Sequence, residues 1–97
     1  MSDKELRDSL VKIFNHYGLK TQLGMLQEES AEAIQAVNKM RRYSDSKSTE
    51  HLVEEIADLY IVLSQLMIYY GPNRVNAIVE KKIARELKRI NNNTMEV

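Results

Sequence analysis

Cysteine is absent from the chain, which excludes both disulfide bonds and thiolate metal sites. Helix-breaking residues are also scarce, with one proline and three glycines in 97 residues, and no segment alternates β-branched with polar residues. Together these absences predict an all-α fold. The length suits one domain, so we predict a single domain over residues 1–97.

A net charge is lacking as well, because 14 Lys and Arg residues balance 14 Asp and Glu residues. The chain as a whole therefore has no electrostatic preference for a nucleic acid polymer or an anionic membrane, and any functional charge must be local. The N-terminal segment MSDKELRDSL has no apolar signal core, which predicts a cytoplasmic protein. The longest apolar run, residues 56–70, is shorter than the roughly 20 residues that a membrane-spanning helix needs.

The first half of the chain has the pattern of two helices. Ser2 and Glu5 match a capping box, which predicts a helix start at Ser2, and Gly18 is a typical helix-ending residue. Alternating steps of four and three then connect apolar residues, with one serine among them, through residues 19–43, which predicts a second helix with one narrow seam: Leu19, Leu23, Leu26, Ser30, Ala33, Val37 and Met40. The polar stretch at residues 44–48 is predicted to be a loop.

A third helix is predicted from Ser48 or Thr49 to the residue before Gly71. Its part at residues 56–70 is apolar on nearly every face, and the other helices of a small monomer rarely cover such a helix fully. We therefore predict a four-helix bundle-like domain that forms a homodimer or homotetramer through this helix. The alternative is a monomer with an exposed apolar patch.

A fourth helix is predicted to follow Asn73 as its N-cap, with residues 91–97 as a frayed tail. Lys82, Arg85 and Arg89 share one flank of this helix. Cations near a helix C-terminus are also favoured by the helix dipole alone, so the flank need not bind a ligand. The predicted core-facing positions are Val75, Val79, Ile83, Leu87 and Ile90.

Two pairs of acidic residues mark the candidate site. Glu29 and Glu32 are three residues apart in one helix, and Glu55 and Asp58 are three apart in the next, so each pair lies on one helical face. No Lys or Arg occurs in residues 48–73 to neutralise the second pair. If the two helices are antiparallel neighbours, four carboxylates converge and repel one another, and a divalent cation with oxygen ligands relieves that repulsion. We predict a Mg²⁺ site, with Mn²⁺ as a possible replacement, and metal-assisted hydrolysis of a phosphoanhydride.

The acids could also be ordinary helix residues that bind no metal. A single Glu-x-x-Glu pair is common, and acids near a helix start complement the helix dipole. Gln22 and Met25 lie beside the first acid pair on the helical wheel. Both are candidates for the border of a base pocket, where the Gln22 amide would hydrogen-bond to a base edge.

EESAE at residues 28–32 and EIAD at residues 55–58 resemble the E-E-x-x-E … E-x-x-D signature of MazG-like nucleotide pyrophosphohydrolases, members of the all-α NTP pyrophosphatase superfamily. The resemblance covers most of the chain. It implies a helical homo-oligomer that cleaves a (d)NTP between the α and β phosphates, giving the monophosphate and pyrophosphate. The implied Mg²⁺ ligands are Glu29, Glu32, Glu55 and Asp58. Glu28 matches the first acid of the signature and would orient or deprotonate the attacking water.

The same family carries a Lys, an Asn and an Arg on its last helix for phosphate contacts. Lys82 and Arg89 fit the first and third positions, whereas Glu86 stands in the Asn position. This departure puts the phosphate-binding detail in question, and Arg85, on the same flank, is the candidate substitute.

Two alternative functions remain open from the sequence. One is a pyrophosphohydrolase of the same superfamily that acts on phosphoribosyl-ATP or dUTP, although Gln27 precedes Glu28 where the phosphoribosyl-ATP enzymes usually have glycine. The other is a non-catalytic helical oligomer whose acids are solvated or bind a basic partner.

Overall fold

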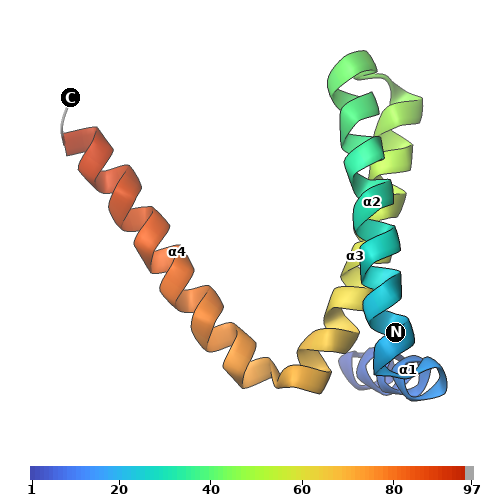
Figure 1. Ribbon diagram of the computed structural model, residues 1–97. Coiled ribbons are helices and arrows are strands. Elements are labelled where there is room, and N and C mark those ends of the chain that lie inside the picture. Colours follow the sequence, from blue (N-terminus) through green and yellow to red (C-terminus); the bar gives the residue numbers. More distant parts are fainter. Residues whose placement is uncertain (96–97) are drawn as a thin grey trace. The chain divides into compact units, whose positions relative to one another are not determined.

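The computed structural model describes residues 1–95, with side chains through residue 93. Within that range the chain forms four helices and no strand, α1 (Asp3–Tyr17), α2 (Leu19–Tyr43), α3 (Ser46–Tyr70) and α4 (Pro72–Met95) (Figure 1). The predicted all-α fold class is thus confirmed. The chain contacts divide it into two compact units, residues 1–66 and the residues from 67 onward. Within the described residues, the helices contain no apolar stretch that could span a lipid bilayer.

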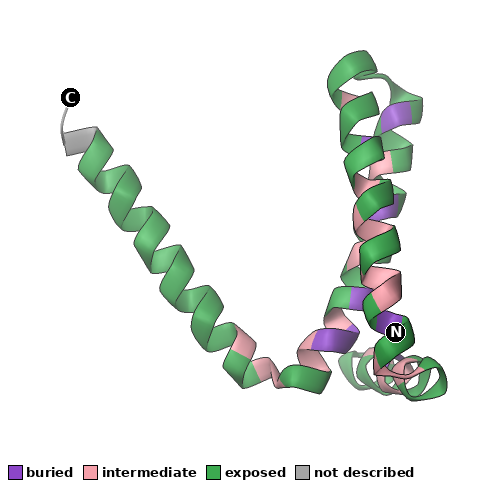
Figure 2. Cartoon of the chain, in the orientation of Figure 1, coloured by how far each residue is buried: buried purple, intermediate pink, exposed green. Residues whose placement is uncertain are grey.

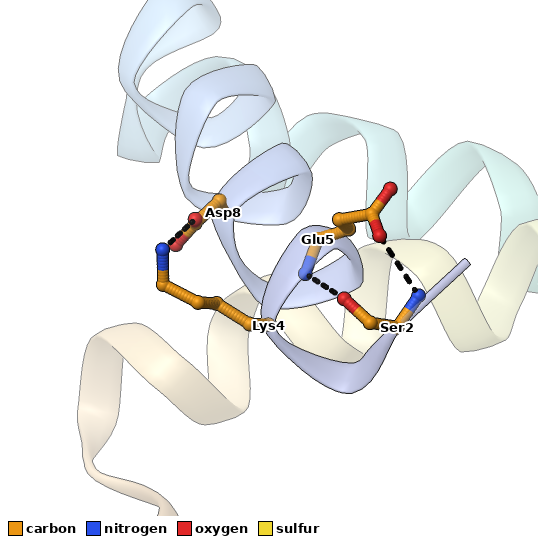
Figure 3. A network of polar contacts seen from close by, with 4 residues as sticks. All are labelled: Ser2, Lys4, Glu5 and Asp8. Carbon is orange, nitrogen blue, oxygen red and sulfur yellow. Dashed lines mark hydrogen bonds and ion pairs between the residues drawn. The ribbon is translucent and has the colours of Figure 1, made fainter.

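The start of α1 is fixed by the predicted capping box (Figure 3). Ser2 Oγ accepts a hydrogen bond from the backbone N–H of Glu5 at 3.1 Å, and the backbone N–H of Ser2 donates to Glu5 Oε1 at 3.4 Å. These two bonds satisfy groups that a helix start otherwise leaves unpaired. One turn on, Lys4 and Asp8 form an exposed ion pair at 3.6 Å.

Gly18 separates α1 from α2 without any further loop residue. Its φ of 87° and ψ of 163° lie in a region that is essentially restricted to glycine, and its N–H donates to the carbonyl oxygen of Phe14 at 2.8 Å. The chain therefore turns sharply and α2 begins at the next residue. Both predicted bounds of α2 agree with the structure.

The turn between α2 and α3 is shorter than the predicted loop at residues 44–48. Ser44 adopts a left-handed conformation with φ of 51°, and its N–H and Oγ–H both donate to the carbonyl oxygen of Met40 at 2.9 Å. Asp45 Oδ1 accepts a hydrogen bond from the Ser48 N–H at 2.7 Å. This side-chain cap allows α3 to begin at Ser46, so the predicted start at Ser48 or Thr49 was late.

In the first unit, α2 and the part of α3 up to Leu66 lie side by side and antiparallel, and α1 packs against α2 (Figure 1). The buried residues are few, and they are shown in purple in Figure 2. Four of them are polar, which is unusual for such a small core. The apolar members are Leu10, Ala36, Val62 and Leu66, and the polar ones are Gln22, Ser48, Glu55 and Gln65.

The second unit contains α4, which starts at Pro72 directly after Gly71. Proline is well suited to the first helical position because its missing N–H has no partner there, so the predicted N-cap at Asn73 was wrong. The helix continues through residues 91–95, which were predicted to fray, while residues 96 and 97 lie outside the described part of the chain.

The predicted core positions of α4 are not buried in the structure. Val75 is half-buried and the other four are exposed, Val79, Ile83, Leu87 and Ile90. Apolar spacing establishes which face of a helix is apolar, but it does not establish what covers that face.

Candidate metal centre and adjoining cavity

Three carboxylates converge between α2 and α3. Glu29 and Glu32 come from neighbouring turns of α2, and Glu55 comes from α3. One oxygen of each lies within 4.8 Å of the other two. Glu55 is buried, with 6% of its surface exposed, whereas Glu29 is half-buried and Glu32 is exposed. The cluster is therefore closed to solvent at Glu55 and open to solvent at Glu32.

Two oxygens of this cluster have no partner. Glu29 Oε2 and Glu55 Oε2 are inaccessible to solvent and accept no hydrogen bond, and neither residue takes part in an ion pair within the described chain. A buried polar group left without a partner costs on the order of 1–3 kcal/mol. A divalent cation would satisfy both oxygens, since carboxylates are the ligands that hard cations prefer.

The electrostatics of Glu29 reflect the same crowding. Removal from solvent, followed by the charges of Glu32 and Asp58 and by contact with Glu55, raises its pKa from 4.5 to about 7. Near neutral pH the cluster thus reduces its repulsion by holding a proton on Glu29. A cation that occupied the cluster would displace this proton, because metal ligands bind in their deprotonated form.

Asp58, the fourth predicted ligand, is not among the three residues whose oxygens lie together. It is exposed, and it lines a cavity of about 320 Å³ that Glu29 also lines. This volume is at the lower end of the range, on the order of 300–1,000 Å³, that small-molecule sites occupy. The remaining wall of the cavity is largely apolar and consists of Ile13, Tyr17, Thr21, Gln22, Met25, Ile61, Val62 and Gln65.

Two buried amides, those of Gln22 and Gln65, also line this cavity. Gln22 Nε2 donates a hydrogen bond to Gln65 Oε1 at 2.9 Å, and the two residues are 4% and 2% exposed. Gln22 was a candidate from the helical wheel, but the sequence analysis missed Gln65. The available signal was a polar residue within the apolar run at 56–70, seven positions after Asp58.

The cations of α4 lie in the second unit. Lys82 and Arg85 line a pocket of about 390 Å³ together with Ile78 and Lys81. Arg89 Nη1 donates to Glu86 Oε1 at 2.6 Å in an exposed ion pair. Arg89 is thus paired with the residue that departs from the family pattern, and phosphate contacts by the three basic residues stay predictions.

Glu28, the predicted water-orienting residue, is exposed on α2. A larger pocket of about 700 Å³ lies at the turn between α2 and α3 and is lined in part by Lys39, Asp45, Lys47 and Glu54. Its charges are of both signs, and the Asp45 carboxylate already caps α3. This pocket therefore lacks the convergent set of like ligands that marks the acid cluster.

Comparison of the chain with models of known protein families, with characterised proteins and with solved structures finds no match. The resemblance to the MazG-like enzymes therefore depends on the acid motifs alone.

Proposed function

We propose that the chain is a divalent-cation-dependent nucleoside triphosphate pyrophosphohydrolase, which converts a (d)NTP and water into the (d)NMP and pyrophosphate. The observation that carries the proposal is the convergence of Glu29, Glu32 and Glu55, two of them with buried unpartnered oxygens, beside a small-molecule-sized cavity that Glu29 also lines. The resemblance of the acid motifs to the MazG-like signature supports the same chemistry.

The donor set suits Mg²⁺, and also Mn²⁺, because all the candidate ligands are carboxylate oxygens. Glu29, Glu32 and Glu55 would hold the ion, and Asp58 would complete the set from the cavity wall. Bound there, the cation neutralises the charge that develops on the phosphate oxygens as the anhydride breaks.

The remaining roles are those that the resemblance implies for other charged residues of the chain. Glu28 is exposed on α2 directly before Glu29, and its carboxylate would orient the attacking water or accept its proton. For Lys82, Arg85 and Arg89 the resemblance implies phosphate contacts, and an ammonium or a guanidinium matches the charge of a phosphate.

The product tests the reaction directly. Incubation with each common and oxidised (d)NTP in the presence of Mg²⁺ should release pyrophosphate and the monophosphate from at least one of them. Release of inorganic phosphate instead would contradict the proposal. Glu55→Gln should lower turnover by roughly 100-fold or more, since it removes a buried ligand charge. Glu54→Gln, at the neighbouring exposed position of α3, is the matched control and should keep turnover.

Two alternatives lead to different results. A preference for phosphoribosyl-ATP or dUTP over the other triphosphates would assign the chain to another branch of the same superfamily. A non-catalytic helical oligomer would release no product and would show no saturable binding of Mg²⁺ or Mn²⁺ in calorimetry.

We also propose that a second copy of the chain covers α3, so that the predicted bundle and the homo-oligomer form together. Apolar residues recur in steps of three and four along one face of this helix and are 45% to 59% exposed, namely Val53, Ile56, Tyr60 and Leu63. This is the spacing of a helix-packing seam. The acids of α3 all lie at residues 50–58, so antiparallel pairing of two copies would keep them apart, whereas parallel pairing would stack them.

A further inference from the structure

The wall of the cavity beside the acid cluster contains little charge. Glu29 and Asp58 are its acidic members, and none of its ten lining residues in the described part of the chain is a lysine, an arginine or a histidine. Within this cavity a polyphosphate can therefore be neutralised only by a cation that the acids hold. The other lining residues suit an uncharged part of a ligand, which in a nucleoside triphosphate is the base or the sugar.

Part of this wall is apolar and yet accessible. Ile13 and Tyr17 from the C-terminal part of α1 are 39% and 56% exposed, and Ile61 from α3 is 42% exposed. Folding usually removes large apolar side chains from water, so a group of exposed ones around a hollow of this size is typical of a ligand site. All three side chains thus have surface left for contact with a ligand.

Tyr17 is the aromatic residue of this wall. It is the last residue of α1, and the sharp turn at Gly18 leads directly into the first turns of α2, where Thr21 and Met25 line the same cavity. The Tyr17 ring makes a T-shaped contact with the ring of His16, with 4.7 Å between the ring centroids and 89° between the ring planes. Such a contact occupies at most one face of the Tyr17 ring, so the other face is available to a second ring.

We propose that the Tyr17 ring stacks on the base of the bound nucleotide, so that α1 forms part of the substrate site together with the acid-bearing helices. The inference deepens the proposed function and rests on it, because it places the base at the uncharged wall while the phosphates lie toward the acids. Every base has a π face, so this contact adds affinity for all bases and selects none of them.

Binding without turnover tests this assignment. The probes are the α,β-imido analogues of the common NTPs and dNTPs, with inorganic tripolyphosphate as a probe that lacks a base, measured by calorimetry with Mg²⁺. Tyr17→Leu stays apolar but removes the ring, and it should weaken the binding of the nucleotide analogues roughly tenfold. Tyr17→Phe keeps the ring and should bind them as the wild-type protein does. Neither variant should change the affinity for tripolyphosphate.

Tyr43→Leu is the matched control. Tyr43 is 59% exposed and lines the larger pocket at the turn between α2 and α3, where most of the lining side chains are charged. This variant should bind every probe as the wild-type protein does. If Tyr17→Leu does not fold, nuclear Overhauser effects between the base protons of a bound analogue and the Tyr17 ring of the wild-type protein provide a second measurement.

The assignment is overturned if no nucleotide analogue binds, or if Tyr17→Leu binds the analogues as tightly as the wild-type protein does. It is also overturned if Tyr17→Leu loses affinity for tripolyphosphate to the same extent, or if the loss or the Overhauser effects occur at Tyr43 instead. The analogues are not hydrolysed between the α and β phosphates, so these outcomes are independent of pyrophosphate release. A protein that shows the expected affinities but releases no pyrophosphate would keep the base site and lose the proposed reaction.

Discussion

At the level of single residues, the candidate site combines burial with negative charge, two properties that oppose each other energetically. Glu55 is almost fully buried, yet one of its oxygens lacks a partner, and Glu29 shares this deficit. Carboxylates in such positions destabilise the folded chain unless a proton or a cation compensates them. Glu29 and Glu55 therefore lower the stability of the metal-free protein, and a bound metal ion would remove this cost.

The raised pKa of Glu29 leads to a pH-dependent stability in the absence of divalent cations. The folded protein holds the Glu29 proton up to about pH 7, whereas the unfolded chain releases it near pH 4.5. The stabilisation from this proton is complete below pH 4.5 and is lost as the pH rises to about 7, so the free energy of unfolding should fall across this interval. Glu29→Gln should flatten the fall in thermal or urea unfolding with a chelator present. Glu28→Gln should retain it, and an unchanged slope in Glu29→Gln would exclude Glu29 as its source.

Mg²⁺ or Mn²⁺ should in turn raise the unfolding temperature of the wild-type protein. A ligand at 100 times its dissociation constant stabilises the folded state by about 2.7 kcal/mol. Glu32→Gln and Glu55→Gln each remove one ligand charge and should reduce this shift, while Glu54→Gln should leave it unchanged. Equal shifts in all three variants, measured by thermal unfolding with and without the metal, would show that the cation binds elsewhere.

At the scale of helices, the short connections decide how α1, α2 and α3 meet. A single residue, Gly18, joins α1 to α2, and only Ser44 and Asp45 join α2 to α3. Such short links keep α2 and α3 adjacent and antiparallel, which brings the two acid motifs to one level. Gly18 in turn joins the acid-bearing α2 to α1, whose residues Ile13 and Tyr17 line the adjoining cavity.

Two glycine substitutions separate backbone strain from packing. A methyl group added at Gly18 or at Gly24 would meet no atom within 4 Å, so neither change causes a clash. Gly18 has a φ of 87° and should lose about 1–3 kcal/mol of stability as Gly18→Ala. Gly24 lies inside α2, and Gly24→Ala should gain about 0.5–1 kcal/mol. Urea unfolding measures both, and a neutral Gly18→Ala would contradict the conformational argument.

At the scale of the whole molecule, much apolar surface is left open. The face of α3 formed by Val53, Ile56, Tyr60 and Leu63 is about half exposed, and so are several apolar residues of α4. Exposed apolar faces of this extent typically belong to an interface. The proposed second copy on α3 accounts for the first of these faces.

Tyr60→Lys tests this interface. A lysine in the middle of the α3 face would place a charge in the buried contact, so the variant should have a lower molar mass than the wild-type protein in light scattering coupled to size-exclusion chromatography. Ile34→Lys, at a 63% exposed position of α2 outside that face, is the control and should keep the wild-type mass. A monomeric wild-type protein, or an unchanged mass for Tyr60→Lys, would contradict the proposed interface.

Local features of the sequence were enough to predict the helices, because helix formation depends on residues that are close together in the chain. The capping box at Ser2, the glycine at position 18 and the spacing of apolar residues each act within a few neighbouring positions, and the bounds of α2 followed from them. The errors occurred where two local signals competed. Asp45 capped α3 earlier than the serines that follow it, and Pro72 began α4 ahead of Asn73.

Which polar residues share a site depends instead on how the helices pack. The spacing of the acids placed each pair on a face, but the packing of α2 on α3 brought Glu55 to Glu29 and Glu32 and left Asp58 on the cavity wall. It also joined Gln22 to Gln65 across 43 positions of sequence, a contact that no local pattern encodes. Contacts of this kind depend on how two helices are rotated against each other, and the apolar seam of a single helix specifies that rotation only coarsely.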